Sequence, residues 1–191
     1  MRVLVACESS GTVRDAFIRK GHDAMSCDLL PTDVPGPHYQ GDVRDVLGNG
    51  WDLMVAHPPC TRLCNSGVSW LAKRDLWEDM RAGAALFRML MEADVPRIAI
   101  ENPIPHKYAV HEIGRMYDQV VQPWWFGHGE TKATCLWLKN LPPLMATAIS
   151  PGRSDRLHRL PPGPERWKER SKTFQGLADA MADQWGSTPA A

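Results

Sequence analysis

The stretch MRVLVACESSGTVRDAFIRKGHDAMSCD, residues 1–28, contains the alternation of elements that decides the fold. Its first apolar run, Val3–Cys7, predicts a buried strand. After a polar turn, apolar residues at helical spacing predict a helix over 13–20, and Gly21 is placed to end it. Residues 22–27 predict a second strand. A strand, a helix and a second strand in this order are typical of a parallel sheet with a crossover helix.

The rest of the chain continues this alternation. Further strands are expected over residues 51–56, 97–100, 120–121 and 133–138, and further helices over 76–91, 111–117 and 175–185. The approach to the last two strands through Trp124-Trp125-Phe126-Gly127 indicates an antiparallel pair at one edge of the sheet. The stretch at about 141–172 is rich in proline and arginine and predicts a loop. The sequence therefore predicts an α/β fold with a doubly wound, mostly parallel sheet.

Composition narrows the class of protein. The chain has 191 residues and a mass of 21.4 kDa, so we expect one domain over residues 1–191. Lys and Arg number 22, as do Asp and Glu, which argues against a polycation that coats nucleic acid by charge alone. No apolar run approaches the roughly 20 residues of a membrane span, and the N-terminus does not resemble a signal peptide. Five scattered cysteines argue against a disulfide framework, so we expect a cytoplasmic protein without membrane association.

Acidic residues follow several of the expected strands, where ligands gather in parallel sheets. Glu8, Ser10 and Gly11 follow the first strand, and a glycine there lets a ligand approach backbone N–H groups. Asp28, at the end of the second strand, suits ribose hydroxyls. Asp42 is placed to accept a hydrogen bond from an amine such as that of adenine. These residues favour a nucleoside site, although a simple turn and helix caps would use the same residue types.

The segment Ala-His-Pro-Pro-Cys, residues 56–60, follows a buried strand. Its two prolines forbid helix and central strand, so they hold Cys60 at the tip of a rigid loop, as a nucleophile requires. A core cysteine in a turn is the alternative. A metal site of His57, Cys60 and Cys64 matches no paired zinc spacing, and we expect no metal.

The segment Glu101-Asn102-Pro103 follows another buried strand. If this strand neighbours the one before Cys60, the Glu101 carboxyl lies close to the cysteine loop. A buried, protonated Glu101 would donate a hydrogen bond to a ring nitrogen. A solvated strand end is the alternative for this residue alone.

In this order, the segments resemble the motifs of the cytosine-C5 DNA methyltransferases, which use S-adenosylmethionine. The resemblance covers most of the chain. Three segments match the family's cofactor motifs: Ser9-Ser10-Gly11 matches the Phe-x-Gly turn, Asp28 matches the ribose-binding acid, and residues 41–46 match the adenine-contacting Gly-Asp-Ile segment. Pro59-Cys60 matches the Pro-Cys loop, residues 101–103 match Glu-Asn-Val, residues 126–134 match the Phe-Gly motif with its basic pair, and residues 174–185 match the final motif. The chain departs from the pattern at Val13, in place of a second glycine, at Thr61, in place of Gln, and at Thr134, in place of the second basic residue.

The resemblance implies a Rossmann-like fold of the class I S-adenosylmethionine-dependent methyltransferase type and methyl transfer to C5 of cytosine in DNA. Cys60 would be the nucleophile that adds to C6, Glu101 would bind N3 and the exocyclic amine, and Lys132 would support the base or a phosphate. His57 would help to lower the pKa of Cys60. The implied cofactor site consists of Glu8, Ser10, Gly11, Asp28, Asp42 and Pro59.

Only 27 residues, Met145–Ser171, stand where that family inserts a target-recognition domain. Residues 153–172 include seven Lys or Arg but only three Asp or Glu. This excess of basic residues favours a clamp on the DNA backbone over a merely solvated loop. The expected DNA-binding residues are Arg153, Arg156, Arg159, Arg166, Trp167 and Lys168. A homodimer on DNA or a separate specificity partner would supply further contacts.

Two other functions stay open on the sequence. His-Pro-Pro-Cys is similar to the Asp-Pro-Pro-Tyr loop of amino-methyltransferases, which modify N4 of cytosine or N6 of adenine, but lacks its acid and its ring. A nucleotide- or DNA-binding module without activity, or an enzyme acting on a free nucleotide, would also fit the altered cofactor turn. A small enzyme of this kind suits a phage or a bacterial genome island.

Overall fold

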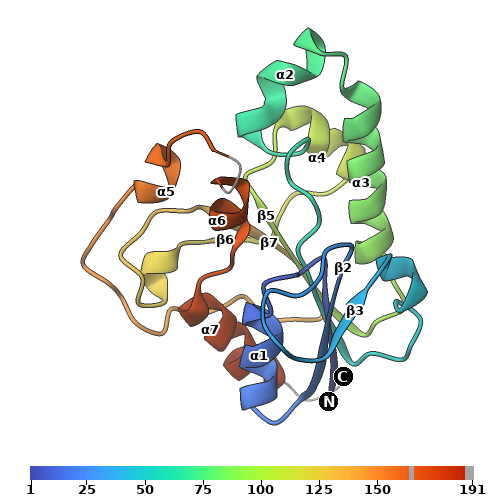
Figure 1. Cartoon of the computed structure of the whole chain (residues 1–191), viewed down its shortest axis with the longest axis vertical. Coiled ribbons are helices and arrows are strands. Elements are labelled where there is room, and N and C mark those ends of the chain that lie inside the picture. The colour runs from blue at the N-terminus through green and yellow to red at the C-terminus, as the bar shows by residue number, and fades with distance from the viewer. Residues whose placement is uncertain (164–165, 188–191) are drawn as a thin grey trace.

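Seven strands form one sheet in the part of the chain that the structure, a computed structural model, describes: residues 1–163 and 166–187 (Figure 1). The strands are β1 (Arg2–Ala6), β2 (Asp23–Asp28), β3 (His38–Gln40), β4 (Leu53–Ala56), β5 (Arg97–Pro103), β6 (Gln119–Val121) and β7 (Thr134–Lys139). Their order across the sheet is β3-β2-β1-β4-β5-β7-β6. The first five strands in this order are parallel, and β7 runs antiparallel to both of its neighbours.

Helices cover both faces of this sheet (Figure 1). Helices α1 (Thr12–Arg19) and α7 (Gln175–Gly186) pack on one face, and α3 (Trp77–Met91) packs on the other with α4 (Lys107–Ile113). Successive side chains of β1 point to opposite faces of the sheet and so contribute to both cores. Val3 and Val5 pack with α1 and α7, and Leu4 and Ala6 belong to the core with α3 and α4. The shorter helices are α2 (Val68–Lys73), α5 (Arg156–Arg159) and α6 (Arg166–Ser171).

The structure confirms the predicted fold class, including the antiparallel pair β6–β7 at one edge. The C-terminal helix expected at about 175–185 is α7. Three local predictions were wrong. The short strand β3 follows a proline-rich segment and shows no apolar run, α2 was not anticipated, and the stretch 141–172 contains α5 and α6 besides loop.

The strand β5 also extends beyond its expected end at Ile100. Its last residues keep their pairing because β7 lies along them, with Glu101 opposite Leu136 and Asn102 opposite Cys135. On its other side, β5 pairs Ile100 with Ala56 of β4. His57, which follows Ala56, therefore leaves the sheet beside Glu101, which stays paired with β7.

No helix of residues 1–163 and 166–187 has the length and apolar character that a membrane crossing requires.

Helix α7 packs against the segment that leads to β7. The backbone N–H of Gly176 donates to Nε2 of His128 at 2.9 Å, and a Cβ at Gly176 would lie 1.9 Å from the carbonyl oxygen of Phe126. The first turn of α7 thus tolerates only glycine at this position.

Replacing Gly176 by alanine should lower the free energy of unfolding by about 1–3 kcal/mol or more, because the helix must move away from a rigid carbonyl. Thermal unfolding followed by circular dichroism measures this change. Gly48→Ala is the matched control, since a Cβ there meets nothing within 4 Å. Equal melting temperatures for the two variants would contradict this account of α7.

Candidate active site

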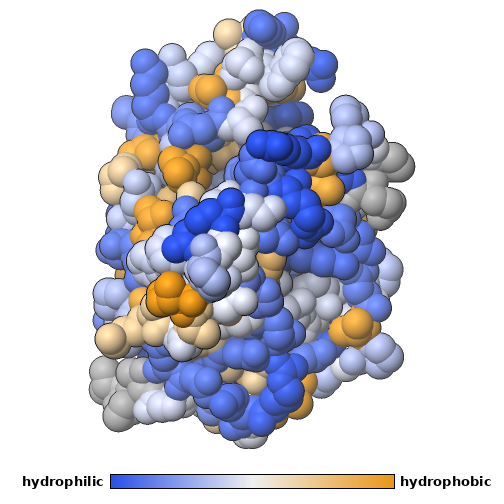
Figure 2. Space-filling model, turned by 90° about the vertical axis from the view of Figure 1, so that its left-hand side faces the viewer, coloured by the Kyte–Doolittle hydropathy of each residue, from blue (hydrophilic) through white to orange (hydrophobic). Residues whose placement is uncertain are grey.

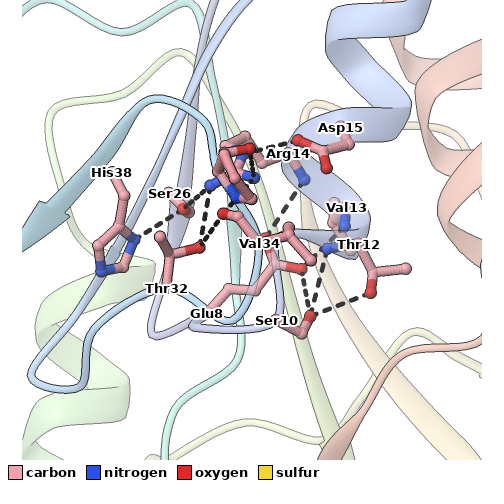
Figure 3. Close-up of polar contacts among 11 residues, drawn as sticks. Glu8, Ser10, Thr12, Val13, Arg14, Asp15, Ser26, Thr32, Val34 and His38 are labelled. Carbon is pink, nitrogen blue, oxygen red and sulfur yellow. Dashed lines mark hydrogen bonds and ion pairs between the residues drawn. The ribbon is translucent and has the colours of Figure 1, made fainter.

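The first turn at the carboxyl edge is organised by Glu8, which follows β1 (Figure 3). Its carboxylate accepts hydrogen bonds from the backbone N–H of Val13 at 2.8 Å and of Arg14 at 3.2 Å, and from Ser10 Oγ at 2.9 Å. A buried anion at the N-terminus of α1 is stabilised by these unsatisfied amides and by the helix dipole. Glu8 and Ser10, both expected at the cofactor, therefore shape the turn.

Gly11 and Arg14 hold the next loop against this turn. Gly11 has a φ of 73°, and a Cβ there would lie 2.6 Å from a guanidinium nitrogen of Arg14. The Arg14 side chain is fully buried and donates to Ser26 Oγ, Thr32 Oγ1 and the carbonyls of Val34 and Pro35 (Figure 3). The sequence analysis missed Arg14, although an arginine beside the apolar stripe of a helix was a visible signal.

A cavity of about 280 Å³ opens beside this turn. Asp28, Asp42 and Pro59, three of the expected cofactor residues, line it together with Cys7, Cys27, Leu29, Gly41, Val43, Arg44 and Leu86. Glu8, Ser10 and Gly11 are not among the lining residues. The Asp28 carboxylate accepts from Leu30 N–H at 2.9 Å, and Asp42 accepts from the N–H and the guanidinium of Arg44. Acceptor oxygens beside apolar walls suit a nucleoside, whose hydroxyls and amine donate hydrogen bonds.

The cysteine loop begins where this cavity ends, since Cys60 directly follows Pro59. The Cys60 carbonyl accepts hydrogen bonds from the N–H groups of Leu63 and Cys64, at 2.9 and 3.0 Å. The two cysteines therefore lie on one tight turn. Asn102 Nδ2 donates to the Pro58 carbonyl at 2.9 Å and ties the start of this loop to β5.

The two thiols of this turn interact. A hydrogen bond from Cys60 to Cys64, together with burial, raises the pKa of Cys60 well above its ordinary value. The same hydrogen bond, with further donation from Ser66 and the Gly67 backbone, lowers the pKa of Cys64 to about 5. Cys60 and Cys64 therefore titrate as one hydrogen-bonded pair and not as two independent thiols. All five cysteines have free thiols, and no three His, Cys, Asp or Glu side chains in the described ranges are grouped to hold a metal.

Glu101 and His57 form a buried pair at the carboxyl ends of β5 and β4, where Nδ1 of His57 lies 2.8 Å from Oε2 of Glu101. Burial opposes the charge on Glu101, but the hydrogen bond from His57 and the positive charge of Lys132 outweigh it and hold the pKa of Glu101 below its ordinary value. Burial likewise opposes protonation of His57, yet Glu101 holds the pKa of His57 above its ordinary value. Sequence reasoning expected a protonated Glu101 and did not pair it with His57.

Lys132 is the third expected catalytic residue, and its charge acts on Glu101, His57 and Cys60. Its Nζ donates to the carbonyl of Lys172 at 3.0 Å, which ties the end of α6 to the approach of β7. The structure thus brings Cys60, Glu101 and Lys132 into one electrostatic neighbourhood.

The expected DNA-binding residues lie on the segment of α5 and α6, on a face that is mostly hydrophilic with scattered apolar residues (Figure 2). Trp167 is 58% exposed, but the basic side chains have partners within the chain. Arg153 lies over the Trp124 ring and donates to two carbonyls, Arg156 pairs with Glu130, Arg159 with Asp155, Lys168 with Asp33, and Arg166 donates to the Leu160 carbonyl.

A second basic and aromatic surface was missed by the sequence analysis. On α2, the Trp70 side chain is exposed, the Arg74 guanidinium carbon lies 4.4 Å from the ring centroid, and Lys73 Nζ lies 5.5 Å from it. Tyr108 on α4 is also exposed and has Lys107 beside it. Because α2 follows the cysteine turn directly, this surface borders the candidate site.

Comparisons place this architecture among methyltransferases. No protein-family model and no curated protein sequence matches the chain. A solved structure described as a DNA modification methyltransferase encoded within an Escherichia coli prophage is similar with a TM-score of 0.53 and 16% identity, over 84% of this chain and 55% of that one. The Entamoeba histolytica methyltransferase EhMeth gives a TM-score of 0.51 and 15% identity, over 78% and 57%.

The chain therefore has the fold of these methyltransferases and spans little more than half of their length. This confirms the fold that the sequence resemblance implied. Membership of the cytosine-C5 family stays a prediction, since at such identity the likeness extends to the fold alone.

Removing the sulfur of Cys64 should lower the pKa of Cys60, because the hydrogen bond to Cys64 is the largest cause that raises it. A thiol reacts with iodoacetamide as the thiolate, so Cys60 in Cys64→Ala should be alkylated faster than in the wild type at pH 8. Peptide mass spectrometry over a pH series measures this rate. Cys135→Ala, which removes a buried cysteine outside the turn, is the control. Identical pH profiles for Cys60 in all three proteins would refute the coupling.

Proposed function

We propose that this protein transfers a methyl group from S-adenosylmethionine to C5 of cytosine in DNA through a covalent adduct on Cys60. One observation carries the proposal: Pro59 lines the nucleoside-sized cavity, and Cys60 follows it at the point where the charges of Glu101 and Lys132 act. The methyltransferase fold of the two similar structures supports the reaction class.

In this proposal, the cavity holds the adenosine part of the cofactor. Asp28 accepts hydrogen bonds from the ribose hydroxyls and Asp42 from the adenine amine, while Val43 and Leu86 cover the apolar ring faces. Glu8, Ser10 and Gly11 set the shape of the turn beside the cofactor through the capping of α1. The cofactor supplies an electrophilic methyl group at a carbon of the substrate base.

The chain's own residues would activate that base. Cytosine C5 is a poor nucleophile, and addition of the Cys60 sulfur to C6 makes it enamine-like. Cys60 reacts as the thiolate, and its hydrogen bond to Cys64 raises the pKa at which that thiolate forms. Glu101 binds N3 and the exocyclic amine, and Lys132 adds positive charge where negative charge develops. Loss of the C5 proton and of the thiolate then completes the substitution.

DNA is the proposed partner because two basic and aromatic surfaces flank the cysteine turn. A target base must leave the duplex to reach Cys60, at a cost of a few kcal/mol. The exposed rings of Trp70 and Trp167 offer stacking partners, and Arg74 and Lys73 lie beside the Trp70 ring. Arg156 and Arg159 form ion pairs at the surface, and such pairs are worth little, so phosphates can replace their present partners at low cost. A homodimer on DNA or a separate specificity partner remains part of this proposal.

Methylation through Cys60 should leave a trapped adduct on DNA that contains 5-fluorocytosine, because fluorine is not lost as a proton. Denaturing electrophoresis with the wild type should show this adduct in the presence of S-adenosylmethionine, Cys60→Ala should show none, and Cys64→Ala should retain it. Mass spectrometry of the nucleosides gives an independent product identity. N4-methylcytosine or N6-methyladenine made by Cys60→Ala would contradict the covalent mechanism and favour an amino-methyltransferase.

Asp28→Asn and Asp42→Asn should each weaken S-adenosylmethionine binding by about 1–3 kcal/mol, since each replaces a charged acceptor in the cavity. Asparagine keeps one side-chain oxygen, which can still accept from the N–H of Leu30 or of Arg44 and so protects the local turns, while position 42 loses its contact with the Arg44 guanidinium. Titration calorimetry gives the affinities. Asp45→Asn is the control, because Asp45 contacts Tyr39 and does not line the cavity. No binding by the wild type, or equal affinity in all variants, would rule out this cofactor site.

A further inference from the structure

We propose that His57 and Glu101 form a proton relay in which His57 supplies, through Glu101, the proton that the pyrimidine takes at N3 as Cys60 adds to C6. The inference rests on the proposed function and deepens it, because it assigns His57, at the start of the Pro-Pro-Cys loop, to the substrate's proton balance. His57 is a positioning residue in this scheme, since it acts through Glu101 and does not itself contact the base.

The geometry of the pair comes from the register of the sheet. Ala56 of β4 lies opposite Ile100 of β5, so His57, which follows β4, lies level with Glu101, which β5 still holds against β7. The backbone N–H of His57 donates to the Ala6 carbonyl at 2.9 Å, which extends the parallel ladder by one residue and fixes the base of the side chain. The 2.8 Å contact between Nδ1 and Oε2 follows from this placement.

The His57 ring has one polar partner within the described chain. Its Nε2 is buried and has no hydrogen-bond partner there, whereas Nδ1 faces Glu101. A buried imidazole that only needed structural satisfaction would use both nitrogens. The fixed contact is thus the one that links the imidazole to the carboxylate proposed to bind the base.

The charges around the pair favour one shared proton. Glu8 after β1 and Glu101 on β5 stabilise protonated His57, and Lys132, before β7, opposes it. Lys132 and His57 in turn stabilise the Glu101 carboxylate. The cysteine pair lies at the same edge, and the lowered pKa of Cys64 favours negative charge there. A carboxylate in this state accepts from the exocyclic amine but has no proton for N3.

The relay supplies the proton that the Glu101 carboxylate lacks, and no proton is gained or lost by the pair over the cycle. As the Cys60 sulfur bonds to C6, the electron pair of the C5–C6 double bond is displaced through the ring toward N3. The Nδ1 proton of His57 moves to the Glu101 carboxylate, which leaves a neutral imidazole, and the Glu101 carboxyl then gives that proton to N3. When the C5 proton has left to water and the Cys60–C6 bond has broken, the N3 proton returns along the same path. The pair therefore ends the cycle as it began.

The pKa of His57 sets the direction in which the rate of Cys60 addition depends on pH. His57 has a raised pKa, so it holds the relay proton below that pKa and loses it as the pH rises. The rate of Cys60 addition should therefore fall on the alkaline side because of His57, although deprotonation of the thiol pair favours addition there. Exchange of tritium from cytosine C5 into water, with DNA and protein but no methyl donor, reports addition apart from methyl transfer.

His57→Asn is the decisive variant, because its amide N–H reaches the Nδ1 position and donates to Glu101 without a transferable proton. At saturating DNA, its exchange rate should fall by about 100-fold with little change in the KM for DNA, and the alkaline decline should disappear. His106→Asn is the matched control: His106 is a buried histidine of the same edge, its Nδ1 accepts from Ala109 N–H, and asparagine preserves that cap. Its pH profile should match the wild type.

Glu101→Gln provides a second variant in case His57→Asn fails to fold, and it should show the same loss of the alkaline decline. The double variant should lose no more than the worse single variant, because the two residues act as one unit. Wild-type rates and profile in His57→Asn, or a uniform loss across the pH series with the profile kept, would overturn the relay. Absence of both exchange and the 5-fluorocytosine adduct in the wild type would instead overturn the proposed function, and the relay with it.

Discussion

Parallel pairing of β4 between β1 and β5 is the constraint on which the candidate site depends. This pairing places Cys7 after β1, His57 after β4 and Glu101 near the end of β5 at one edge of the sheet. The loops that follow these strands share the narrow space above the sheet, so their polar groups must pair with each other. The contacts of His57 with Glu101 and of Asn102 with Pro58 are the result. A shift of β4 by one residue would turn His57 to the opposite face and separate the pair.

Buried charge at this edge serves two different purposes. Glu8 and Arg14 are held by several hydrogen bonds each, which fixes the turn before α1 and the loop after β2 as one unit. His57 and Glu101 are largely buried but are bound mainly to each other, and Nε2 of His57 has no hydrogen-bond partner among residues 1–163 and 166–187. A fully satisfied network rigidifies a protein, whereas a pair with unused capacity keeps its proton mobile. The first arrangement supports the cavity, and the second is suited to chemistry.

The segment of α5 and α6 links the two ends of the site. Lys168 pairs with Asp33 in the loop after β2, and Lys132 donates to the Lys172 carbonyl at the other side. This segment therefore spans from the cavity side to the catalytic side of the carboxyl edge. Its arginines are engaged in local contacts, so the surface presents fewer free cations than the composition indicates. Under the proposed function, contacts to DNA would therefore also come from the basic and aromatic side chains of α2.

The sequence by itself determined the order of strands and helices, the acids at strand ends and the rigid loop before Cys60, because periodicity, proline and short motifs are local properties. It also favoured Glu101 beside that loop. Only the tertiary structure decided that Glu101 is a carboxylate bound to His57, 44 positions earlier in the chain, and that Cys60 shares a proton with Cys64. It likewise decided that Glu8 caps α1 and does not line the cavity. Protonation states and hydrogen-bond partners depend on burial and on strand register, and neither is encoded in any single segment of the sequence.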